Sequence, residues 1–143
     1  MNKNDPTDKF ENELKKVDNN KKLKEYLSKL DKLEAGLYLQ KLLDEKGKKV
    51  KDIVDNGNVS ESLIYKFIGG ERGMGRDKIL IIACSISLSV EETNKLLKMS
   101  GHNKLYAKDK RDSLLIYALE NKKSVEEIVL LIEENDIDFE ILQ

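Results

Sequence analysis

Apolar residues recur at helical spacing along most of this 143-residue chain, but they are sparse in its first quarter. That segment is rich in Lys, Asp and Asn, and its apolar residues follow i, i+4, i+7 spacing at Phe10, Leu14 and Val17. Asp18-Asn19-Asn20 interrupts this stripe, which predicts a short helix, a break and a second helical piece over Lys21–Leu30. We interpret residues 1–32 as a Lys-rich helical extension that is either solvated or loosely packed.

The apolar pattern strengthens after residue 33 and predicts three helices in close succession. The first ends at Gly47, since glycine readily adopts the positive φ of a helix C-terminus. A second helix of barely two turns, Lys48–Val54, is followed by the turn Asp55-Asn56-Gly57-Asn58. A third follows with Ser60 as its N-cap and closes at Gly69-Gly70. Two short helices joined by a tight, Gly-containing turn are typical of a helix-turn-helix.

The second half of the chain contains an internal repeat. Arg76–Leu97 and Arg111–Ile132 lie 35 positions apart and share ten identities in 22 positions without a gap. In each unit an Arg-Asp pair opens one helix, and an S-x-x-E capping box starts the next, at Ser89 and at Ser124. The repeat predicts a helical hairpin used twice. Two copies are too few for a free-standing solenoid, so we expect them to extend the core of the preceding helices.

These features resemble the lambda-repressor/Cro-like (XRE-type) family of helix-turn-helix proteins. The family's turn, buried aliphatic residue and glycine correspond to Gly57-Asn58-Val59-Ser60, Ile64 and Gly70. The chain is also similar to a group of small Firmicutes transcriptional regulators, in which a repeated helical hairpin follows a Cro-like domain. That similarity rests on Tyr65, Gly70-Glu71-Arg72, both Arg-Asp pairs and the linker Ser100–Tyr106. The resemblance covers residues 25–137 and implies sequence-specific DNA binding by a homodimer that reads two half-sites.

The family's geometry implies a recognition helix over about Ser60–Ile68 in the major groove of double-stranded DNA. Candidates for base contacts on this helix are Ser60, Ser62, Tyr65 and Lys66. Candidates for phosphate contacts flank it, namely Lys48, Lys49, Lys51, Arg72 and Arg76. The core would include Ile53, Val59, Ile64, Phe67, Leu80 and Ala83. For Tyr65 the alternative is packing between helices, and for the lysines it is an ordinary solvated surface.

The composition of the predicted recognition helix leaves a second function open. The helix holds one Lys and one Glu but no Arg, Gln or Asn, so it is poor in bidentate base contacts. Glu61 in its first turn stabilises a helix N-terminus but repels phosphate. The alternative to a DNA-binding regulator is therefore a protein-interaction adaptor or antitoxin-like module with the same fold. Its docking surface for a protein partner would be the acidic segment 120–143.

The formal net charge of −1 averages over unlike segments. Residues 120–143 hold two Lys against eight acidic residues, so residues 1–119 carry a net charge of +5. The linker Lys95–Arg111 holds six basic residues and one acidic residue. It is either a phosphate clamp beside the recognition helix or an ordinary loop that Leu105 and Tyr106 anchor. The near-neutral total permits DNA binding without requiring it.

Residues that could carry catalysis are scarce. His102 is the single histidine and is expected on a surface loop, while the single cysteine, Cys84, is expected in the core. The acidic tail lacks the spacing of a calcium loop, and Gly69–Gly75 lacks the Lys-Ser/Thr of a phosphate loop. We therefore expect no enzyme, no cofactor and no metal site.

The chain shows neither the apolar core of a signal peptide nor a span long enough for a membrane. Its longest apolar run, Ile79–Cys84, is six residues, against roughly 20 for a transmembrane helix. We expect a soluble, cytoplasmic, all-α protein. Its parts would be the extension 1–32, a Cro-like helix-turn-helix domain over 33–97 and a C-terminal helical hairpin with an acidic tail over 98–143.

Overall fold

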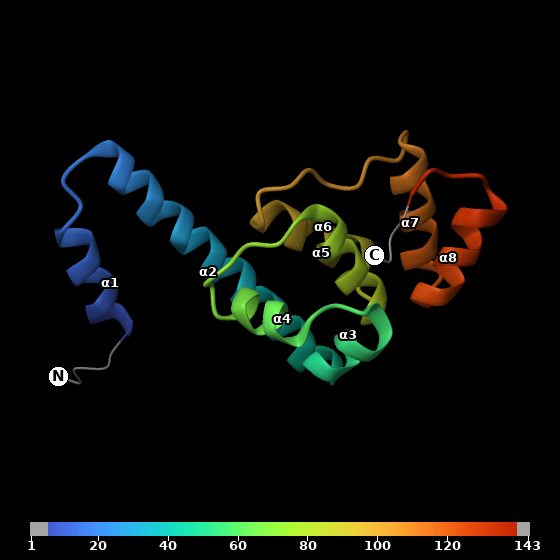
Figure 1. Ribbon diagram of the computed structural model, residues 1–143, viewed down its shortest axis with the longest axis horizontal. Coiled ribbons are helices and arrows are strands. Elements are labelled where there is room, and N and C mark those ends of the chain that lie inside the picture. The colour runs from blue at the N-terminus through green and yellow to red at the C-terminus, as the bar shows by residue number, and fades with distance from the viewer. Residues whose placement is uncertain (1–5, 140–143) are drawn as a thin grey trace.

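The computed structural model describes residues 6–139, and every regular element within them is an α-helix, which confirms the all-α expectation (Figure 1). The helices are α1 (Pro6–Lys15), α2 (Asn20–Lys46), α3 (Val50–Gly57), α4 (Glu61–Ile68), α5 (Arg76–Ser85), α6 (Val90–Met99), α7 (Lys110–Glu120) and α8 (Val125–Glu134). Residues 1–5 of the expected extension and 140–143 of the acidic tail lie outside the described residues. Within the described part of the chain, no helix is long and apolar enough to cross a membrane.

α2 joins two segments that the apolar pattern separates. It runs unbroken for 27 residues, starting at the N-cap Asn19, whose side chain accepts a hydrogen bond from the backbone N–H of Lys22 (2.9 Å). It ends at Gly47, which has the expected left-handed conformation (φ 63°). The boundary expected between residues 32 and 33 therefore lies inside a continuous helix. Only its C-terminal half belongs to the body, since the first buried residue of α2 is Ala35.

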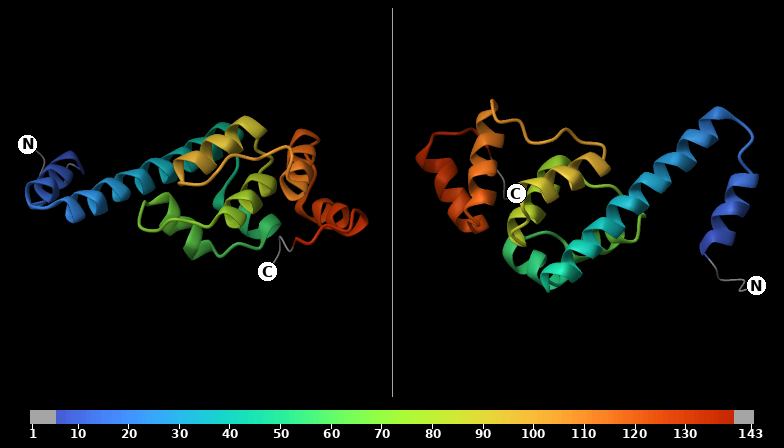
Figure 2. Two further views of the ribbon diagram at one scale, coloured as in Figure 1. Left: turned by 90° about the horizontal axis from the view of Figure 1, so that it is seen from above. Right: turned by 180° about the vertical axis from the view of Figure 1, so that it is seen from behind.

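α1 and the N-terminal half of α2 form an arm that projects from the body (Figures 1 and 2). The two helices are joined by an ion pair between Lys29 and Glu13 (2.8 Å). The hydroxyl of Tyr26 also donates a hydrogen bond to the carbonyl oxygen of Phe10 (3.4 Å). Among the described side chains of residues 7–33 none is fully buried, so the arm is loosely packed.

The main core lies among the C-terminal half of α2 and the next four helices. α2 packs on α4 and α6, α3 packs on α4 and α5, and α5 packs on α6. The six residues expected in this core are all buried, with at most 1% of each exposed: Ile53, Val59, Ile64, Phe67, Leu80 and Ala83. Burial of this kind is the main stabilising term of a small helical protein. It fixes the positions of α3 and α4.

α4 approaches α2 so closely that only a glycine fits at the contact. A Cβ atom at Gly36 of α2 would overlap the carbonyl oxygens of Phe67 and Ile68 at the C-terminal end of α4. These are backbone atoms, which cannot rotate aside as the end of a flexible side chain does. The position of α4 on α2 therefore depends on the absence of one side chain.

The hairpins α5–α6 and α7–α8 share their local structure as well as their sequence. Both expected capping boxes are present, because the hydroxyl oxygens of Ser89 and Ser124 accept hydrogen bonds from backbone N–H groups in the first turns of α6 and α8. Left-handed backbone recurs at the same offset of 35, at Ser87 (φ 53°) and Lys122 (φ 51°). The two hairpins are therefore equivalent in structure.

The hairpins pack on one another through reciprocal contacts. α5 contacts both α7 and α8, and α6 contacts α7. A two-fold rotation that exchanges the hairpins also exchanges the α5–α8 and α6–α7 contacts, as in an isologous pair of subunits. The second hairpin thus extends the core of the first through a pattern of helix contacts that has pseudo-two-fold symmetry.

Gly36→Ala is expected to lower the free energy of unfolding by about 3 kcal/mol, because α4 must move away from α2. Gly75→Ala is the control, since a Cβ atom there meets nothing within 4 Å and its φ is −66°. The control is expected to stay within about 1 kcal/mol of the parent. Urea unfolding followed by circular dichroism measures both. Equal stability of the two variants would contradict the close contact between α2 and α4.

Candidate nucleic-acid interface

The turn between α3 and α4 is three residues long and is fixed at each position. Asn58 adopts the left-handed conformation (φ 53°), and the side chain of Val59 is buried. The hydroxyl oxygen of Ser60 accepts a hydrogen bond from the backbone N–H of Leu63 (3.5 Å), which confirms Ser60 as the N-cap of α4. The two short helices are therefore held in one relative orientation.

α4 has two distinct faces. Ile64 and Phe67 are buried on the side that meets α2 and α3. The opposite side consists of exposed residues at i, i+1, i+4 and i+5, namely Glu61, Ser62, Tyr65 and Lys66. One face thus anchors the helix, and the other is free to meet a partner.

All four candidates for base contacts are exposed: Ser60, Ser62, Tyr65 and Lys66. The side chain of Tyr65 is 56% exposed, so it is not packed between helices, which was the alternative for this residue. Ser62 and Lys66 flank it on the same face of α4. Ser60 has its oxygen engaged as the cap, while its O–H remains able to donate.

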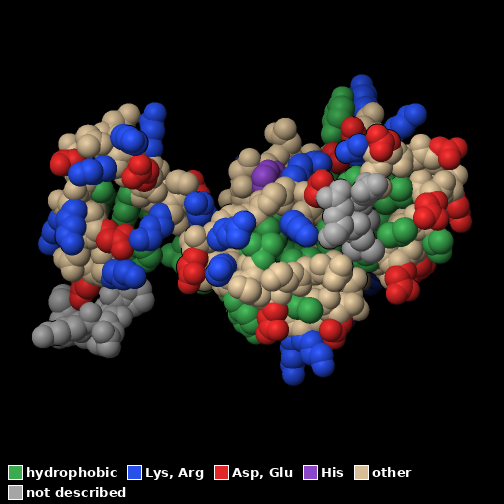
Figure 3. Space-filling view, in the orientation of Figure 1, with side chains coloured by type: hydrophobic (Ala, Val, Ile, Leu, Met, Phe, Trp, Pro, Cys, Tyr) green, Lys and Arg blue, Asp and Glu red, His purple; other side chains and the backbone are tan. Residues whose placement is uncertain are grey.

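Four of the five candidates for phosphate contacts are also exposed: Lys48, Lys49, Lys51 and Arg72. The lysines lie where α2 gives way to α3, and a small basic group is visible at this lower edge of the molecule, beside acidic groups (Figure 3). Arg72 lies in the loop that follows α4. None of the four forms an ion pair with any residue in the described range 6–139.

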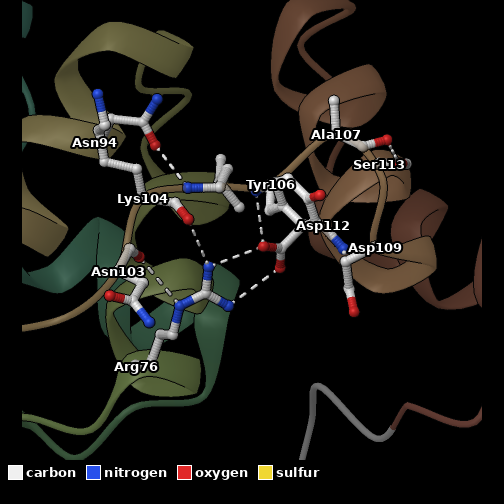
Figure 4. A network of polar contacts seen from close by, with 10 residues as sticks. Arg76, Asn94, Asn103, Lys104, Tyr106, Ala107, Asp109, Asp112 and Ser113 are labelled. Atoms are coloured by element: carbon white, nitrogen blue, oxygen red, sulfur yellow. Dashed lines mark hydrogen bonds and ion pairs between the residues drawn. The ribbon is translucent and has the colours of Figure 1, made fainter.

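Arg76 has a different role from the phosphate contact expected of it (Figure 4). Its two terminal nitrogens donate to the two carboxylate oxygens of Asp112, at 3.0 and 2.8 Å. Its Nε and Nη2 also donate to the backbone carbonyl oxygens of Asn103 and Lys104, both at 3.2 Å. The guanidinium therefore joins the first hairpin to the second and to the linker between them, instead of presenting a free charge to DNA.

Asp112 completes this network from the second hairpin. Its side chain is 8% exposed, and it accepts a further hydrogen bond from the backbone N–H of Tyr106 (2.8 Å). Burial opposes ionisation of this carboxyl group, but the hydrogen bonds from Arg76 and Tyr106 outweigh burial, and the pKa of Asp112 is lowered. The hydrogen bond to Asp112 in turn raises the pKa of Arg76. The pair is ionised at neutral pH.

The linker between the hairpins is held mainly through its backbone. The side chain of Asn94 accepts a hydrogen bond from the N–H of Leu105 (2.9 Å), and Nε2 of His102 lies 2.8 Å from the carbonyl oxygen of Met74. The expectation that Leu105 and Tyr106 anchor the linker is right for the half-buried side chain of Leu105. It is wrong for Tyr106, whose side chain is exposed. Tyr106 joins the Arg76–Asp112 network through its backbone N–H.

Two further kinds of chemistry-bearing group are the single cysteine and the metal-ligating side chains. Cys84 is buried, and burial raises the pKa of its thiol to about 12, so it stays protonated at neutral pH. Among the described residues, no group of three or more His, Cys, Asp or Glu side chains is placed to hold a metal ion.

Comparison with known proteins adds no assignment to this geometry. No family model, no curated protein and no solved structure matches the chain. The resemblance to the lambda-repressor/Cro-like family therefore rests on the sequence motifs alone.

Asp112→Ala is expected to lower the free energy of unfolding by about 3 kcal/mol, because Arg76 and the N–H of Tyr106 lose their acceptor. Asp77→Ala is the matched control, since Asp77 holds the equivalent position in the first hairpin and is exposed. Its loss is expected to cost less than about 1 kcal/mol. Chemical denaturation measures both values, and a larger loss for Asp77→Ala would contradict the role assigned to Asp112.

The ion pair between Arg76 and Asp112 predicts that the stability of the fold depends on pH. The pKa of Asp112 is lower in the folded chain than its unfolded value of about 3.9, so its stabilising contribution is complete well above that value. The contribution is lost as the pH falls through the folded pKa. We expect the stability difference between the parent and Asp112→Ala to be constant near neutral pH and to shrink in acid. A difference that stays constant down to about pH 2 would contradict the ionised pair.

Proposed function

We propose that this protein is a sequence-specific, DNA-binding transcriptional regulator that inserts α4 into the major groove. The observation that carries the proposal is the two-sided character of α4. Ile64 and Phe67 anchor one side, while the other side presents Ser62, Tyr65 and Lys66 to solvent. An α-helix fits the major groove, and side chains along its exposed face are the ones that reach base edges.

The proposed contacts divide by chemistry. Lys66 donates to acceptors on guanine, and the hydroxyls of Ser62 and Tyr65 donate to or accept from base edges. Lys48, Lys49, Lys51 and Arg72 contact phosphates, which positions the protein but reads no sequence. Glu61 disfavours a phosphate next to the first turn of α4, so it helps to set the position of α4 along the major groove.

The number of proposed phosphate contacts sets how strongly DNA binding depends on salt concentration. Four phosphate contacts per protomer correspond to a salt slope of about −3.6 in log K against log salt concentration. Two protomers on two half-sites double this value. Binding is thus expected to weaken steeply, and measurably, between about 50 and 200 mM salt.

Two experiments test the proposal. The first measures binding to mixed duplex DNA by fluorescence anisotropy at about 50 and about 200 mM salt. The second selects a preferred duplex from a random pool. Salt-dependent binding with a recoverable consensus supports a regulator. No binding even at about 50 mM salt would overturn the proposal and would favour a protein-interaction module with the same fold.

Lys66→Glu is expected to weaken binding to the selected duplex at least about 100-fold, because a donor becomes an acceptor beside the DNA. Lys24→Glu is the control, since it makes the same charge change at an exposed lysine on the arm. Circular dichroism verifies that both variants keep their helices. Equal affinities of the two variants would show that α4 is not the reading helix.

Replacing Lys48, Lys49 and Lys51 together by Gln is expected to weaken binding to all duplexes alike. The salt slope should fall by about 2.7 per protomer, because three phosphate contacts are lost. The preferred sequence should not change, since phosphate contacts carry no sequence information. An unchanged slope would remove these lysines from the interface.

A further inference from the structure

The second hairpin exposes an apolar face that the first hairpin buries. At the offset of 35 residues, Ile79, Ile82 and Leu96 of the first hairpin correspond to Leu114, Tyr117 and Leu131 of the second. The first three are completely buried in the core. Of their counterparts, Leu114 is also buried, but Tyr117 is 52% exposed and Leu131 is only half-buried.

This uncovered face is hollowed. Leu114, Tyr117, Leu131 and Ile137 line a groove of about 610 Å³ between α7 and α8, with Lys108 and Lys110 at one end. Leu130 of α8, the neighbour of Leu131 in the sequence, is 56% exposed, whereas its counterpart in the first hairpin is the charged Lys95. The surface of the second hairpin therefore carries one more large apolar side chain than that of the first. Hydrophobic groups are visible among acidic ones on this part of the molecule (Figure 3).

The charges around the groove are arranged in a self-complementary way. α7 and α8 are antiparallel, so the start of α7, with Lys108 and Lys110, lies beside the end of α8, with Glu133 and Glu134. Lys110, Leu114 and Tyr117 share one face of α7 at i, i+4, i+7. On α8, Glu134 shares a face with Leu130 and Leu131 at i+4 and i+3. Lys108 and Lys110 thus make one end of the groove basic, while Glu133 and Glu134 lie outside its lining, on the exposed surface at the end of α8.

We propose that two copies of this chain pair through this face to form a homodimer. A two-fold axis that runs along the helices places α7 of one copy over α8 of the other, with their matching ends together. The basic start of α7 then meets the acidic end of the partner's α8, while Tyr117, Leu130 and Leu131 are covered. The pairing supplies two copies of α4 but does not depend on DNA binding.

Sedimentation equilibrium of the full chain over about 1 to 200 μM tests this dimer. The parent is expected to have twice the 16.4 kDa mass of one chain. Tyr117→Lys combined with Leu130→Lys is expected to raise the dimer dissociation constant at least about 100-fold. Leu37→Lys is the matched control, because Leu37 is an exposed leucine of α2, 58% exposed, and its replacement should leave the dimer intact.

A charge exchange provides a second test that leaves the apolar groove untouched. Lys110→Glu is expected to weaken the dimer, and adding Glu134→Lys in the same chain is expected to restore it. A monomeric parent, a dimer that survives the double lysine variant, or dissociation caused equally by Leu37→Lys would each overturn the proposal. If the parent is a monomer that still binds duplex DNA, the proposed dimer is overturned but the proposed function is not.

Discussion

The close contact between α2 and α4 at Gly36 is the constraint on which the rest of the structure depends. Because no side chain intervenes, the carbonyl oxygens of Phe67 and Ile68 lie directly against α2. Ile64 and Phe67 can then enter the core, which leaves the opposite face of α4 outward. The same helix that fixes α4 also packs on α6, so α2 links the proposed reading helix to the repeated hairpins.

An ion pair between the Arg-Asp motifs of the two hairpins joins the first hairpin to the second. Both copies begin with an Arg-Asp pair, but the copies use these residues differently. Arg76 binds Asp112 across the hairpins, whereas the guanidinium carbon of Arg111 lies 5.2 Å from the centre of the Phe139 ring. The ion pair is bidentate and largely shielded from water, so it fixes the second hairpin more firmly than surface charges do. The proposed dimer face lies on the part of this hairpin that the ion pair leaves free.

Features set by local sequence could be predicted, and features set by distant contacts could not. Helical periodicity identified the core around Ile64 and Phe67, and serine spacing identified the capping boxes of α6 and α8. A helical piece over Lys21–Leu30 was predicted, but its continuity with the helix after residue 33 was missed. The sparse apolar residues before residue 33 suggested a boundary there, although a solvated helix tolerates polar residues all round. The partner of Arg76 lies 36 residues away, so only the repeated Arg-Asp pair could have suggested it.

We propose that the exposed face of α4, held in place by α2, reads DNA. The most direct measurement is a titration of the ¹⁵N-labelled protein with a duplex selected by the protein itself, followed by backbone amide shifts. If α4 reads DNA, the largest shifts fall on residues 60–69, with smaller ones at the start of α3. Shifts confined to α7 and α8, or to the arm, would contradict it.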